Sequence, residues 1–187
     1  LLANHSFSGD VGTTVSIRVR SQDSAGLTVE QVLLVPVVQR PLPVVINEIN
    51  YNPADNSQET EYIELHNAGT SAADVGNWRI ANAVAYTIPP GTMIPAGGYL
   101  VIAENPGALS NWHNVTSLGP WTGNLASEGE TIELRDAAGL LVDSTEFGTT
   151  APWPATPNGD GPSLELANPL LENQLGGNWS ASTVSLG

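Results

Sequence analysis

The acidic residues between positions 47 and 61 are the group best suited by type and spacing to carry chemistry. The loop Asp55-Asn-Ser-Gln-Glu-Thr-Glu61 follows Asn47, Glu48 and Asn50. Calcium takes about six to eight oxygen ligands, and loops that alternate carboxylates with amides supply them. Together with an aspartate in an N-terminal turn, the candidate calcium ligands are Asp23, Glu48, Asp55, Glu59 and Glu61. The loop lacks the glycine and the final glutamate of an EF-hand. We favour the alternative of a solvated polar loop, with Glu48 and Glu64 capping strand edges or pairing with Arg79.

A second candidate site lies in the long connection at 104–127, which has little strand pattern. It contains Trp112, His113 and Trp121 among glycine, proline, asparagine and serine residues. Connections longer than about 15 residues are often functional, and tryptophan rings could stack on a sugar or anchor a protein partner. We favour the alternative that both rings fold down and plug one end of the domain.

Several kinds of catalytic site lack the residues they need. The sequence contains neither Cys nor Lys, which excludes thiolate nucleophiles, cysteine metal sites and Schiff bases. The three histidines, His5, His66 and His113, form no HExxH motif, and there is no Gly-x-Ser-x-Gly elbow. Among 19 acidic residues, some carboxylate pairs arise by chance. A hydrolase that uses such a pair is therefore kept only as the least favoured function. We therefore expect a non-catalytic protein without a cofactor, with calcium as the one exception to test.

The charge balance narrows the range of partners. Nineteen acidic residues face five basic ones, all arginine, and the formal net charge is −14. Binding to nucleic acid needs clustered basic residues that displace counterions from phosphates, and binding to anionic lipid needs them as well. No run of residues approaches the roughly 20 apolar positions of a membrane span. We expect neither nucleic-acid binding nor membrane insertion.

The elements that carry these residues are short strands. Stretches of alternating polar and apolar residues lie between 19 glycines and 14 prolines, which is typical of an all-β sandwich or barrel. Strands at 14–20 and 27–35, joined by a turn at 22–26, predict an N-terminal hairpin. Prolines at 36, 41 and 43 mark a junction, so we divide the chain into 1–40 and 41–187. Within the second part, Trp78 is predicted to be a core residue.

The second part resembles the bacterial lamin tail domains over about residues 43–183. The resemblance rests on an ordered set of segments: VVINEINYNP at 44–53, EYIELHN at 61–67, DVGNWRI at 74–80, YTIPPGTMIPAGGYLVI at 86–102, GETIELRDAAGLLVD at 129–143, APWP at 151–154 and SLEL at 163–166. It implies an immunoglobulin-like β-sandwich of about eight or nine strands without catalytic residues. Glycines 97–98 and the Asp136–Gly139 segment also predict hairpin turns.

The first 40 residues are similar to the C-terminal end of a cadherin-like repeat. The matching features are the strand pair SIRVRSQDSAGLTVEQVLLVPV and its turn from Asp23 to Gly26. In such repeats an aspartate at this turn helps to bind calcium between domains. The linker at 39–43 lacks the acidic string that cadherin-like repeats use for that purpose.

The resulting hypothesis is an immunoglobulin-like β-sandwich with an N-terminal β-hairpin appendage. We expect a non-catalytic interaction or structural module of a larger secreted or cell-surface protein, which binds a protein or a glycan. Two exposed strands are marginal in water on their own, so the hairpin could pair between copies to give a homodimer. The alternative function is a calcium-dependent adhesion or stability module.

Overall fold

The protein divides into two compact units, Leu1–Pro41 and Leu42–Gly187. The computed structural model describes residues 14–36, 43–54 and 58–183. Its strands in chain order are β1 (Thr14–Gln22), β2 (Thr28–Pro36), β3 (Val44–Asn50), β4 (Tyr62–Asn67), β5 (Ala73–Asp74), β6 (Arg79–Asn82), β7 (Tyr86–Thr87), β8 (Met93–Ile94), β9 (Tyr99–Ala103), β10 (Gly129–Arg135), β11 (Leu141–Gly148), β12 (Leu164–Leu166) and β13 (Trp179–Ala181). The helical elements are α1 (Pro106–His113) and two single 3₁₀ turns, Gln58–Thr60 and Gly176–Asn178.

The first unit contains the antiparallel hairpin of β1 and β2. Thr14 lies opposite Pro36, and Gln22 lies opposite Thr28. The turn is closed by the Asp23 carboxylate, which accepts backbone N–H bonds from Ala25 and Leu27, each at 2.9 Å. The predicted hairpin and its turn are confirmed. Asp23 serves here as a turn acceptor, as short polar side chains commonly do.

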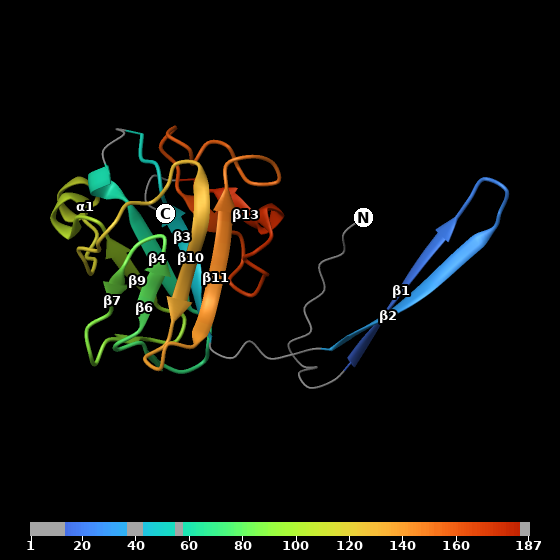
Figure 1. Ribbon diagram of the computed structural model, residues 1–187, viewed down its shortest axis with the longest axis horizontal. Helices are drawn as coiled ribbons and strands as arrows, with labels where there is room; N and C mark the ends of the chain where they lie inside the picture. The colour runs from blue at the N-terminus through green and yellow to red at the C-terminus, as the bar shows by residue number, and fades with distance from the viewer. Residues whose placement is uncertain (1–13, 37–42, 55–57, 184–187) are drawn as a thin grey trace. The chain divides into compact units, whose positions relative to one another are not determined.

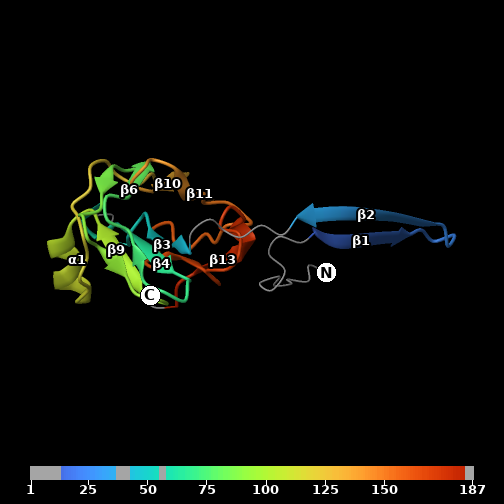
Figure 2. The ribbon, with the colours of Figure 1, turned by 90° about the horizontal axis from the view of Figure 1, so that it is seen from below.

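The second unit is a sandwich of two antiparallel sheets. The strand order is β13-β12-β3-β4-β9 in the five-stranded sheet and β11-β10-β6-β7 in the four-stranded sheet. A small third sheet pairs β5 with β8. Figure 1 shows this unit face-on, and Figure 2 shows the two main sheets as stacked layers, with α1 beside β9. The predicted all-β, immunoglobulin-like sandwich is confirmed.

The inner faces of the two sheets supply the core. Ile49, Ile63 and Ile102 lie side by side on β3, β4 and β9, and all three are fully buried. They belong to one cluster with the inward-facing side chains of the four-stranded sheet, which are Ile80, Ile132, Leu134 and Phe147. Each such side chain contributes roughly 1.5–3 kcal/mol of hydrophobic stabilisation. Trp78 lies in the same cluster, which confirms its predicted core position.

Two of the predicted turns have the expected chemistry. Gly97 and Gly139 have positive φ angles of 66° and 84°, a region that favours glycine. The Gly139 N–H donates to the Asp136 carbonyl at 2.9 Å. The Asp136 carboxylate also accepts from the N–H groups of Ala138 and Leu140. The hairpin turn at Asp136–Gly139 is therefore confirmed, since it joins the paired strands β10 and β11. The chain also turns at Gly97, but a hairpin there was a wrong prediction, because β8 pairs with β5 and β9 pairs with β4.

Helix α1 lies in the 104–127 connection, where the sequence pattern predicted no helix. Asn105 caps it by accepting from the Ala108 N–H at 3.1 Å, and Pro106 occupies its first turn. Leu109 is its one buried side chain and packs against Tyr62 and Ala103. A single buried leucine in eight residues makes no 3.6-residue pattern, which explains the missed prediction. Among the described residues, no helix is long and apolar enough to cross a membrane.

Candidate functional site

Three glutamates lie side by side on the outer face of the five-stranded sheet. Glu48 on β3 is opposite Glu165 on β12 and opposite Glu64 on β4. We call Glu165, Glu48 and Glu64 the carboxylate row. The row faces outward because the next residues along β3 and β4, Ile49 and Ile63, point into the core. Like charges directly opposite each other destabilise a sheet, so this arrangement needs compensating contacts.

Glu48, at the centre of the row, has those contacts. It is only 4% exposed. The hydroxyls of Tyr62 and Ser163 both donate hydrogen bonds to its Oε1 atom. Both donors are themselves buried. A carboxylate that accepts from two hydroxyls forms charge-assisted bonds, which are stronger than bonds between neutral groups.

The outer members of the row are less well compensated. The pKa of Glu64 is raised from 4.5 to about 7, mainly by burial and in smaller part by the charges of Glu48 and Glu165. A hydrogen bond from the Asn47 amide to Glu64 Oε1, at 3.0 Å, acts in the opposite direction. Burial also raises the pKa of Glu165, as does the charge of Glu48. Glu64 and Glu165 therefore take up protons more readily than ordinary surface glutamates do.

A second buried carboxyl group fixes the 104–127 connection to the start of β4. Glu61 is 2% exposed, and its Oε2 accepts from the Leu125 N–H at 3.0 Å. Burial raises the pKa of Glu61 from 4.5 to about 7. The bond to Leu125 lowers that pKa, whereas the charges of Glu104 and Glu130 raise it.

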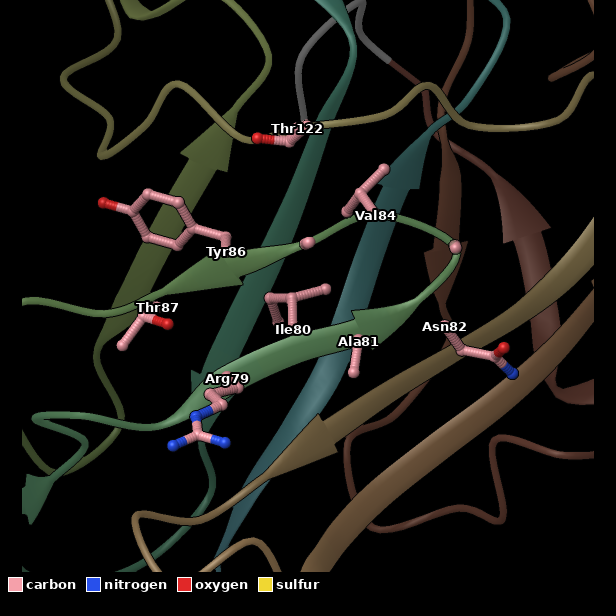
Figure 3. A pocket seen from close by; sticks show the side chains of 10 residues that line it. Arg79, Ile80, Ala81, Asn82, Val84, Tyr86, Thr87 and Thr122 are labelled. Carbon is pink, nitrogen blue, oxygen red and sulfur yellow. The ribbon is translucent and has the colours of Figure 1, made fainter.

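A hollow of about 400 Å³ lies at the β6–β7 hairpin of the four-stranded sheet. Residues 79–87 and Thr122 line it, as Figure 3 shows. No Asp, Glu or His is among these lining residues. The hollow therefore offers no carboxylate pair or His–carboxylate pair of the kind that a hydrolase uses for acid–base chemistry.

A family model described as Lamin Tail Domain matches residues 38–149, more than half of the chain. The chain belongs to the lamin tail domain family. This is an immunoglobulin-like, non-enzymatic fold family. A search among curated proteins returned no match. The matched segment ends before β12 and β13, so Ser163 and Glu165 lie outside the match.

Of the residues predicted to bind calcium, the three that the structure describes in the lamin tail domain, Glu48, Glu59 and Glu61, form no metal-binding group. Glu48 and Glu61 are buried, each with its own protein partners, and Glu59 is exposed. Asp23 closes a turn in the other unit, and Asp55 lies outside the described residues. Within the described ranges, no three acidic or histidine side chains are placed to hold a metal ion. Calcium binding stays a prediction from the sequence.

The aromatic residues of the 104–127 connection differ in their exposure to solvent. Trp121 is buried in the core cluster, whereas Trp112 on α1 is 73% exposed. His113 is half-buried in the last turn of that helix. The predicted burial of both tryptophan rings therefore applies to Trp121. Of the two tryptophans, Trp112 is the one whose ring is exposed to solvent.

Sequence reasoning missed Glu64, Glu165, Ser163 and Arg79 as site residues. Glu64 could have been found, because it alternates with the core residues Ile63 and Leu65. Pairing it with Glu48 required the register of β3 with β4, which shifts between Ile46 and Glu48. Such an irregularity leaves no clear mark in a single sequence.

Proposed function

We propose that this lamin tail domain protein is an interaction module of a larger secreted or cell-surface protein, and that its N-terminal hairpin joins two copies. The observation that carries the proposal is the exposed apolar surface of β1 and β2. Every side chain described in these strands is exposed. Isolated two-stranded hairpins are marginally stable in water, so this hairpin gains stability from whatever covers it.

One face of the hairpin has no charged residue, and we call it the apolar face. Val19, Val29 and Leu33 share this face and are 52%, 72% and 44% exposed. Ile17 holds the register position opposite Leu33 on the same face. The other face carries an ion pair from Arg18 to Glu30 at 3.2 Å. This second face, which we call the hydrated face, combines charged residues with Val32 and Leu34, which are 48% and 71% exposed. The apolar face has no charged residue and is therefore the better suited of the two to a protein contact.

The distribution of charge favours a second hairpin as the partner. Residues 1–41 contain three acidic residues and three arginines, so that unit has no formal net charge. The whole net charge of −14 falls on residues 42–187. Two hairpins can therefore approach without net repulsion, whereas two sandwiches repel each other. Stacking the apolar faces removes Val19, Val29 and Leu33 from water in both copies.

The test is a pair of charge insertions on the two faces of the hairpin. Leu33→Glu is expected to abolish self-association, because it buries an unpaired carboxylate at the centre of the apolar face. Sedimentation velocity on the full chain, across a range of micromolar concentrations, should show a dimer for the wild type and a monomer for this variant.

Leu34→Glu is the matched control, since Leu34 lies opposite Ser16 on the hydrated face. It introduces the same charge one residue away and should leave the dimer intact. A wild-type chain that sediments as a monomer at every concentration would overturn the proposed dimer. Equal effects of both variants would exclude the apolar face as the contact.

The sequence also predicts a calcium-dependent form of the module, supported by the excess of carboxylates. If calcium is bound, millimolar calcium should raise the melting temperature of the full chain by several degrees, because a ligand that binds only the folded state stabilises it. Calorimetry with calcium and with EDTA measures this difference. An unchanged melting temperature would overturn the hypothesis of a calcium-dependent module.

A further inference from the structure

The hollow on the four-stranded sheet has a composition unlike the rest of the sandwich. Three of the residues that line it, Ala81, Ala83 and Ala85, carry only methyl groups. Its rim carries hydrogen-bond donors, namely the amide of Asn82 and the hydroxyls of Thr87 and Thr122. Figure 3 shows these side chains around the hollow, with the guanidinium of Arg79 at one end.

The charge of Arg79 is the second unusual feature. Residues 42–187 contain 16 acidic residues and two arginines, Arg79 and Arg135. Arg135 is paired with Glu133 at 2.8 Å and also donates to the Gly139 carbonyl. Arg79 is exposed and forms no ion pair with any residue that the structure describes. An unpaired cation among so many carboxylates indicates a place for an anion from outside the domain.

The neighbouring strand edge indicates the form of that anion. Ile88 exchanges backbone hydrogen bonds with Asn77 and Trp78, the two residues before β6. By the alternation of antiparallel pairing, Thr87 turns its N–H and C=O away from β6. Ala85 faces the same way, and its N–H and C=O both bond to Thr122, at 2.8 and 3.0 Å. The edge of β7 thus already accepts one extended segment beside the position of Thr87.

Arg79 stands in register with Thr87 across the β6–β7 pair. A peptide strand added at Thr87 would lie about 4.8 Å beyond β7. Its side chain opposite Thr87 would point to the same face as Arg79, and the long arginine side chain reaches across one strand. Asp or Glu at that peptide position would pair with the guanidinium in a charge-assisted bond.

We propose that the hollow is a binding site for an extended acidic peptide segment, whose carboxylate pairs with Arg79 and whose backbone adds to β7 at Thr87. The site lies on residues 79–87 and 122, so it does not depend on the hairpin dimer. Affinity comes from the short strand addition and the ion pair, and specificity for acidic segments comes from Arg79.

The test uses an array of short peptides with blocked ends that contain Asp or Glu, each with a partner in which Asn or Gln replaces the acid. The acidic peptides that bind best are titrated into the ¹⁵N-labelled full chain and followed by NMR. The expected result is a set of shifts confined to residues 79–87 and 122, at least about tenfold weaker binding of the amide partners, and weaker binding at high salt.

Arg79→Gln is expected to weaken the binding of the acidic peptides at least about tenfold, so that they bind no better than their amide partners. Arg20→Gln removes the same charge from an exposed position on β1, in the other unit, and serves as the control, with unchanged affinity expected. The proposal is overturned if no acidic peptide binds, if the shifts fall elsewhere, or if Arg79→Gln binds acidic peptides as well as Arg20→Gln does. Peptides with a free C-terminal carboxylate are tested in the same way. If they bind more tightly than peptides whose only carboxylate is an Asp or Glu side chain, the proposed pairing of Arg79 with an acidic side chain is overturned.

Discussion

Replacing Gly129 by alanine is expected to destabilise the sandwich by about 3–4 kcal/mol. A Cβ atom at this position would lie 2.5 Å from the Phe147 carbonyl oxygen and 3.0 Å from the Gly148 Cα. Both contacts are with backbone at the start of the β10–β11 pair, so no side chain can rotate away. Gly129 also has a φ of 97°, which L side chains rarely adopt. Steric overlap and backbone strain therefore act together.

Gly139→Ala is the matched control for the steric part of this effect. Gly139 has a similar φ of 84°, but a Cβ there meets nothing within 4 Å. Its replacement should cost only the backbone strain, about 1–2 kcal/mol. Urea unfolding followed by tryptophan fluorescence measures both, and all five tryptophans lie at position 78 or beyond, so the signal reports the sandwich alone. Equal losses in the two variants would contradict the steric argument.

The fold of this protein could be predicted because its local signals agree with one another. The alternation at 14–20, the glycines at 97 and 139 and the ordered lamin tail segments all indicate antiparallel strands joined by tight turns. A hydrophobic pattern of period two also fixes which face enters the core, and it does so for Ile63 and Leu65. Helix α1 was missed because its stability depends on the cap at Asn105 and on one tertiary contact of Leu109.

The candidate sites could be predicted only in part, because they depend on pairing across strands. The sequence indicates Glu48 and Glu61 as unusual, but as members of one acidic loop. In the structure Glu48 belongs with Glu64 and with Glu165, which is 117 positions later in the chain. Arg79 was considered only as a partner for glutamates. That it forms no ion pair with a described carboxylate becomes visible only once the strands are assembled.

The two buried carboxyl groups give the domain an unusual dependence on pH. Glu61 and Glu64 each have a pKa raised from 4.5 to about 7. Between these values the folded state binds protons that the unfolded state releases. The stabilising effect of protonation is therefore complete below the unfolded pKa near 4.5 and is lost as the pH rises through about 7. Glu165, whose pKa is also raised, contributes in the same direction.

We expect the free energy of unfolding to be higher at about pH 5 than at about pH 8, by about 2–5 kcal/mol from the two groups together. The nearly inaccessible Glu61 contributes up to about 3 kcal/mol, whereas solvent screening reduces the share of the half-buried Glu64 to about 1–2 kcal/mol. Urea unfolding at a series of pH values measures the difference. The prediction is wrong if stability falls on acidification over this range, as it does for proteins whose carboxylates are held by cations.

Charge-neutral variants assign this dependence to particular residues. Glu61→Gln and Glu64→Gln each keep an oxygen that can accept from Leu125 or Asn47, while they remove the charge that burial disfavours. Each is expected to stabilise the domain at about pH 8 and to flatten the pH dependence by its own share. Glu146→Gln removes the same charge from an exposed position on β11. It should change neither the stability at about pH 8 nor the dependence of stability on pH. If Glu146→Gln stabilises the domain as much as the buried variants do, the cause is the overall charge of −14 and not the burial of these two carboxylates.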